Sequence, residues 1–138
     1  MENISMARNE RGFTLIEIMI MIVVLIVGVL AAIAMASYKN SVIKSRRSAA
    51  AVCLQERAQL MERFYTTRMT YVGAPAPSVC NASLASFYDV SNDPAPTAST
   101  FRIKAVPKGA QASDTSCGTL AIDEKGARTA SSGSNDCW

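Results

Sequence analysis

Glu17 is the residue whose position has the clearest chemical consequence, because it borders an uncharged apolar run from Ile18 to Ala36. A carboxylate in a membrane segment costs about 2.5–3.5 kcal/mol, so such a residue usually marks a function. No Lys or Arg occurs in the twenty positions after Glu17. If the chain is cut between Gly12 and Phe13, the new α-amino group of Phe13 lies one helical turn from Glu17. We therefore expect Glu17 to pair with that amine, on its own chain or on a neighbouring one.

The cysteines are the second set of residues with chemical potential. All four follow the apolar run: Cys53, Cys80, Cys117 and Cys137. None belongs to a Cys-x-x-Cys pair, which disfavours a metal or redox site. An even number of cysteines beyond a membrane segment favours two structural disulfides in an oxidising compartment over four free thiols in a cytosolic protein. Four cysteines allow three pairings, and their spacing alone leaves the choice open.

The basic residues raise a further hypothesis. Five cationic side chains of the C-terminal part are candidates for a stripe that contacts DNA: Arg102, Lys104, Lys108, Lys125 and Arg128. Arg102 and Lys104 would share one face of a strand, and cations in a row neutralise DNA phosphates. The net charge is only +3, from 14 Lys and Arg against 11 Asp and Glu, and Asp114, Asp123 and Glu124 intervene. An evenly charged surface is therefore favoured over a DNA site.

The sequence argues against an enzyme and against a cofactor. The 138 residues contain no His, which removes Ser-His-Asp and Cys-His catalysis and the commonest zinc ligand. Asp123 and Glu124 precede Gly126, a pattern more typical of a β-turn than of a catalytic carboxylate pair. We find no phosphate-binding loop and no metal-ligand spacing.

A membrane helix must position Glu17. The 19 residues from Ile18 to Ala36 span roughly 28 Å as a helix, which just crosses a bilayer core. This run is too long for the apolar core of a signal peptide, so a plain signal anchor is the simplest alternative. Arg8 and Arg11 would then stay in the cytoplasm by the positive-inside rule, which places the C-terminal part of the chain outside.

The remainder of the chain predicts an α+β head. Apolar residues recur at helical spacing after the membrane segment: Ile43, Ala50, Leu54, Ala58, Met61 and Tyr65. No proline precedes Pro75, so we expect one nearly continuous helix from Phe13 to about Thr67. Residues 69–85 and 92–99 are expected to form loops, because both contain prolines and the first also contains Gly73. Strands are expected at residues 87–90, 100–106, 119–123 and 127–130, which predicts a helix laid across a small antiparallel sheet.

The start of the apolar run has a specific resemblance. It reads Arg11-Gly12-Phe13-Thr14-Leu15-Ile16-Glu17 and resembles the class III signal of type IV prepilins, in which a prepilin peptidase cuts after the glycine and methylates the new N-terminal phenylalanine. The resemblance implies that Gly12 is the cleavage residue, that Phe13 becomes the methylated terminus, and that Glu17 recognises a neighbour's terminus during assembly. Residues 28–34 and 37–38 also match the family's anchor, although Ala36 stands where the family commonly has proline.

The resemblance also implies a domain organisation. A leader at residues 1–12 would be removed, residues 13–37 would form a transmembrane and filament-core helix, and residues 38–138 would form a globular periplasmic or surface-exposed head. The implied fold is the type IV pilin fold, a long N-terminal helix packed on a small antiparallel sheet with a disulfide-bounded C-terminal loop. It supports the pairings Cys53–Cys80 and Cys117–Cys137, and the ending of the chain is similar to the minor pilin PilE subgroup.

The implied function is that of a structural subunit, a minor pilin, of a type IV pilus that serves twitching motility, adhesion or biofilm formation. Its implied partners are other pilin subunits, the prepilin peptidase, the inner-membrane assembly platform and inner-membrane lipid. The chain would cross the inner membrane once before assembly and then lie in the extracellular pilus. Two alternatives stay open: a DNA-binding minor pilin that acts as a receptor in natural transformation, and a type II secretion pseudopilin. The cysteines weigh against the second.

Overall fold

The computed structural model describes residues 12–138. Its helices and strands are α1 (Leu15–Arg68), α2 (Ala82–Ala85), β1 (Tyr88–Asn92), β2 (Arg102–Pro107), β3 (Leu120–Asp123) and β4 (Arg128–Ala130), with 3-10 turns η1 (Gly109–Ser113) and η2 (Asn135–Cys137). The chain divides into two compact units between Lys39 and Asn40, and α1 contributes to both. The expected leader, with Arg8 and Arg11, lies outside the described residues apart from Gly12.

In the N-terminal unit, α1 is apolar on every side. All residues from Gly12 to Lys39 are exposed, including large side chains such as Leu15 at 77% and Leu25 at 69%. The helix is long and apolar enough to cross a membrane. A helix that is apolar all round needs lipid or other helices around it, because water would have to solvate its whole surface.

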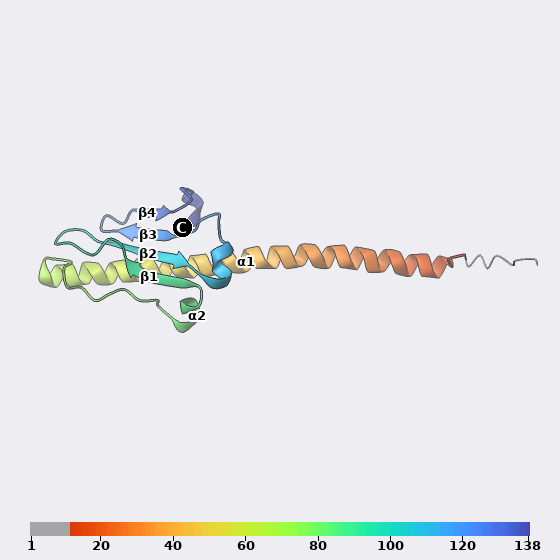
Figure 1. Cartoon of the computed structure of the whole chain (residues 1–138), viewed down its shortest axis with the longest axis horizontal. Coiled ribbons are helices and arrows are strands. Elements are labelled where there is room, and N and C mark those ends of the chain that lie inside the picture. The colour runs from red at the N-terminus through yellow and green to blue at the C-terminus, as the bar shows by residue number, and fades with distance from the viewer. Residues whose placement is uncertain (1–11) are drawn as a thin grey trace, which may run out of the picture. The chain divides into compact units, whose positions relative to one another are not determined.

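In the C-terminal unit, the rest of α1 lies along a four-stranded antiparallel sheet of order β1-β2-β3-β4 (Figure 1). The register places Ile103 opposite Ile122 and Ala105 opposite Leu120, so these four side chains share the face that packs on the helix. The helix contributes its own buried residues at helical spacing: Ala50, Ala51, Cys53, Leu54 and Met61. The α+β fold expected from the alternating segments is confirmed, and each strand begins within two residues of its expected start.

Aromatic side chains close the core where α1 ends. Tyr71 stacks on Tyr65 at 4.7 Å between ring centroids and meets Phe101 edge-on at 4.9 Å. Its hydroxyl donates a hydrogen bond of 2.9 Å to Glu62. Burial of the ring and this hydrogen bond raise the pKa of Tyr71 to about 12. These contacts connect the loop after α1 to the helix and to the start of β2.

The loop expected at residues 69–85 contains one helical turn that the sequence pattern does not predict. Residues 82–85 form α2, which begins at Asn81 because its side chain accepts a 2.8 Å hydrogen bond from the Leu84 amide. A four-residue helix has no room for an apolar periodicity, so only the capping residue could have indicated it.

Two disulfides stabilise the head. Cys53 on α1 is bonded to Cys80, just before α2, and Cys117 is bonded to Cys137 at the end of the chain. The partners are 27 and 20 residues apart, and closing loops of this length stabilises a fold by about 3 kcal/mol each. The second bond joins the C-terminal tail to the segment that precedes β3.

Candidate functional site

The residues expected to act in assembly lie at the start of α1. Gly12 and Phe13 precede the helix, and the Phe13 side chain is exposed. The Glu17 amide donates a 3.3 Å hydrogen bond to the Thr14 hydroxyl, so the Thr14 side chain caps the N-terminus of α1. This contact explains why the helix begins at Leu15. Within residues 12–138, the Glu17 carboxylate forms no ion pair, so it is free to contact another chain.

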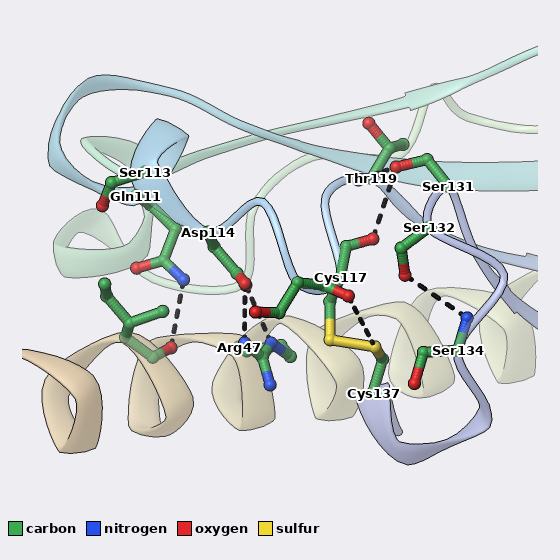
Figure 2. Close-up of polar contacts among 12 residues, drawn as sticks. Arg47, Gln111, Ser113, Asp114, Cys117, Thr119, Ser131, Ser132, Ser134 and Cys137 are labelled. Atoms are coloured by element: carbon green, nitrogen blue, oxygen red, sulfur yellow. Dashed lines mark hydrogen bonds and ion pairs between the residues drawn. A yellow bond between two sulfur atoms is a disulfide. The ribbon is translucent and has the colours of Figure 1, made fainter.

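A part-buried ion pair fixes the segment between β2 and β3 onto α1 (Figure 2). Arg47 donates from Nε to Asp114 Oδ2 at 2.8 Å and from Nη2 to Oδ1 at 2.6 Å. The Asp114 side chain is 1% exposed and that of Arg47 is 13% exposed. The hydrogen bond that Arg47 donates to Asp114 raises the pKa of Arg47. Two parallel hydrogen bonds to one carboxylate fix both the distance and the orientation of the two segments.

Gln111 makes a second contact between this segment and α1. Its side-chain amide donates to the Ile43 carbonyl at 3.0 Å and to the Tyr88 hydroxyl at 3.1 Å (Figure 2 shows the bond to α1). Burial raises the pKa of Tyr88. Gln111 is fully buried; these two bonds satisfy its side-chain nitrogen and hold η1 at a fixed place on the helix, while its Oε1 has no hydrogen-bond partner among the described residues.

The C-terminal loop is closed by hydrogen bonds as well as by its disulfide. Ser131 Oγ accepts from the Thr119 amide at 3.0 Å and donates to the Cys117 carbonyl at 3.3 Å. A Cβ at Gly118, whose φ is +65°, would lie 2.2 Å from that oxygen, so glycine is required there for space and for backbone conformation. The Trp138 indole donates to the Thr129 carbonyl at 3.1 Å and covers the edge of the sheet at β4.

The sheet face that points away from α1 contains part of the predicted basic stripe. Arg102 and Lys104 lie on this face, since Ile103 and Ala105 between and after them are buried. The register places Lys104 beside Ala121 and Ala121 beside Thr129. These residues line a groove of about 390 Å³ on this face, which we call the outer-face groove, together with Asp93, Pro94, Val106, Thr119, Ala130 and Ser131.

Carboxylates neutralise much of the charge at the outer-face groove. In the groove, Lys104 forms an ion pair of 2.5 Å with Asp93. Outside its lining, Lys108 forms one of 2.7 Å with Asp89. The hydrogen bond from Lys104, and then its charge, lower the pKa of Asp93. Arg102 keeps a long bond of 3.4 Å to the Thr129 hydroxyl and has no carboxylate partner in the part of the chain that the structure describes.

The structure brings together only some of the five basic residues of the predicted stripe. Lys125 lies in the exposed turn between β3 and β4. Arg128 is registered opposite Ile122, which faces the core, so Arg128 lies on the other side of the sheet from Arg102. It sits 5.7 Å from the Trp138 ring instead. Arg102 and Lys104 therefore form the compact part of this candidate DNA surface, and hydroxyl groups adjoin it.

A metal site has no basis in the described residues. From Gly12 to Trp138, no three His, Cys, Asp or Glu side chains are grouped so that they could hold an ion. The described residues offer two candidate surfaces, which are the apolar start of α1 and the outer-face groove.

Comparison with known proteins places these features in a family. Residues 36–121 match the family described as type IV minor pilin ComP, DNA uptake sequence receptor. A solved type IV pilin from Shewanella oneidensis is 32% identical, with 70% of this chain and 97% of that chain covered and a TM-score of 0.56. The non-core minor pilin PilV of Neisseria meningitidis is 21% identical, covers 70% of this chain and 92% of its own, and has a TM-score of 0.53, which indicates a shared fold. No curated protein matches the chain.

Proposed function

The chain belongs to the type IV minor pilin family, and on this premise we propose that it assembles into a pilus through the first half of α1. One observation carries the proposal: every residue of α1 from Leu15 to Lys39 is exposed, and the large apolar side chains among them surround the helix. Lipid covers such a surface before assembly, and neighbouring pilin helices cover it afterwards. The protein is thus a structural subunit, with no catalytic step assigned to it.

We further propose the processing steps that the N-terminal motif implies. A prepilin peptidase removes residues 1–12 by cutting after Gly12 and methylates Phe13. Residues 13–37 hold the subunit in the inner membrane as a single pass, with residues 38–138 on the far side, until an inner-membrane assembly platform adds it to the filament. Glu17 then pairs with the Phe13 amine of a neighbouring subunit. A carboxylate in apolar surroundings needs a cation, and this amine supplies it. Twitching motility, adhesion or biofilm formation would follow from the filament.

Shearing tests the subunit assignment. The full chain with an epitope tag in the exposed turn at Lys125 is expected to co-sediment with filaments sheared from its native host and to disappear from this fraction when the platform is deleted. Retention of all of the chain in the cell membrane, with filaments otherwise present, would contradict assembly.

A second function is a DNA receptor in natural transformation, and the family description favours it. On this chain, the outer-face groove supplies the chemistry: Arg102 and Lys104 can reach phosphates, and the hydroxyls of Thr119 and Thr129 can donate hydrogen bonds to them. The ion pair of Lys104 with Asp93 limits the charge, so we expect weak, salt-sensitive binding rather than a tight duplex clamp.

The double variant Arg102→Ala/Lys104→Ala tests the receptor function. Each phosphate contact contributes about −0.9 to the slope of log affinity against log salt concentration. Loss of two contacts should therefore make this slope less steep by about 1.8. Duplex binding should also weaken by about tenfold or more. Fluorescence anisotropy of a labelled duplex with the full chain in detergent measures both quantities. Lys44→Ala, an exposed lysine on α1, is the matched control and should change neither. Equal binding by the double variant would exclude this groove, and no binding at low salt would end the receptor function while leaving the filament function intact.

A further inference from the structure

A second groove of the head lies between the last turns of α1 and the loop that follows it. It measures about 390 Å³, and most of its lining is apolar. The apolar side chains come from both walls: Leu60, Met61, Phe64, Pro75 and Pro77. Arg57 and Arg63 also line it, so we call it the arginine-rimmed groove. Its volume falls within the range of about 300–1,000 Å³ that is usual for binding pockets.

The walls of the arginine-rimmed groove are fixed before anything binds. The Cys53–Cys80 disulfide ties the end of the loop to α1. Arg57 donates from Nε to the Ser78 carbonyl at 2.8 Å and from Nη2 to the Val79 carbonyl at 3.4 Å, next to that disulfide. A preformed groove loses little conformational entropy when a ligand enters, which favours binding of a short segment.

The rim has uncompensated positive charge. Within residues 12–138, neither Arg57 nor Arg63 is paired with a carboxylate, and the same holds for Arg68, whose guanidinium lies 5.7 Å from the Phe64 ring. No acidic residue lines the groove. The neighbouring Glu62 already accepts a hydrogen bond from Tyr71. A ligand for this groove should therefore bring carboxylates to the rim as well as an apolar group to the centre.

We propose that the arginine-rimmed groove docks an extended segment of a partner protein with one large apolar side chain flanked by acidic residues. Arg, Met and aromatic residues are enriched in protein interfaces, whereas Lys and acids are depleted, and the lining has this composition. Carboxylates on both sides of the apolar side chain would reach Arg57 and Arg63. Duplex DNA fits less well, because its backbone needs a row of cations and donors and here the walls are Leu, Met, Phe and Pro. This inference goes beyond the filament and receptor functions.

A random heptapeptide library on phage tests the proposal with the full chain in nanodiscs as bait. We expect enrichment of sequences with a large apolar residue flanked by Asp or Glu, relative to empty nanodiscs. Synthetic peptides of these sequences should bind at least about tenfold more weakly to Leu60→Asp and to Arg63→Glu, because hot-spot contacts account for most of the affinity. Both side chains are exposed, so neither change disturbs the core. Lys125→Glu, a charge reversal in the exposed β3–β4 turn, should bind as the parent chain does.

Three results would overturn the proposal. The first is the absence of enrichment over empty nanodiscs. The second is enrichment of the wrong peptides. These would be neutral or basic sequences, or acidic ones that bind Leu60→Asp and Arg63→Glu as tightly as they bind the parent chain. The third is competition by nucleic acid: a labelled single-stranded oligonucleotide binds the parent chain, does not bind the Arg63→Glu variant, and displaces the peptides. This result would make the groove a nucleic-acid site.

Discussion

Replacing Arg47 with methionine is expected to lower the free energy of unfolding of the head by about 3–5 kcal/mol. The Asp114 side chain is 1% exposed, and Arg47 supplies two charge-assisted hydrogen bonds to it. Without Arg47, a buried carboxylate remains with no opposite charge, and burial of an unpaired charge is strongly unfavourable. The fluorescence of Trp138, the only tryptophan, follows urea unfolding of the full chain in detergent and reports on the tail beside β4.

Two controls separate charge burial from loss of packing. The double variant Arg47→Met/Asp114→Leu removes both charges and should recover most of the lost stability, because a buried pair can be replaced by apolar residues at little cost. Lys104→Met breaks a more exposed ion pair and should leave the urea midpoint nearly unchanged. If Arg47→Met unfolds at the same urea concentration as the parent chain, the Arg47–Asp114 contact does not stabilise the head.

Replacing Glu17 with valine is expected to reduce incorporation into sheared filaments by at least about tenfold. During assembly, the Phe13 amine of one subunit enters apolar surroundings. There the Glu17 carboxylate of the neighbouring subunit is the anion that pairs with it. Removing the carboxylate leaves that amine unpaired, whereas membrane insertion should continue because valine is more apolar than glutamate. Immunoblots of the sheared and membrane fractions measure the two outcomes in the same cells.

Thr14→Ala is the control for a purely local role of Glu17. Thr14 accepts the hydrogen bond from the Glu17 amide, so this change removes the helix cap and keeps the carboxylate. We expect Thr14→Ala to assemble at a level close to that of the parent chain. If it assembles as poorly as Glu17→Val, the helix cap explains the defect and the pairing with a neighbour's terminus is refuted.

The sequence was most informative where the pattern is local. The charge-free run from Ile18 to Ala36 and the absence of proline before Pro75 predict one long helix, and α1 runs from Leu15 to Arg68. Alternation around Ile103 and Ile122 predicts two strands, and these two residues lie opposite each other in the sheet. Both features depend on neighbours a few positions apart, which is the range over which periodicity operates.

Contacts between distant segments were not predictable in the same way. Arg47 and Asp114 are 67 residues apart, and nothing in the spacing of either residue indicates an ion pair. From the sequence, Asp114 is only a charge that interrupts a basic stripe. Arg128 belongs to the other side of the sheet because of the β3–β4 register, which depends on the turn and on burial rather than on charge.

Mass spectrometry of sheared filaments from the native host reads the N-terminus of the assembled chain, so it tests processing and assembly in one measurement. We predict a chain that starts at methylated Phe13, lacks residues 1–12, and is scarce beside a dominant pilin. A chain that still carries residues 1–12 and occurs only in the membrane fraction would contradict assembly and leave a plain membrane-anchored protein.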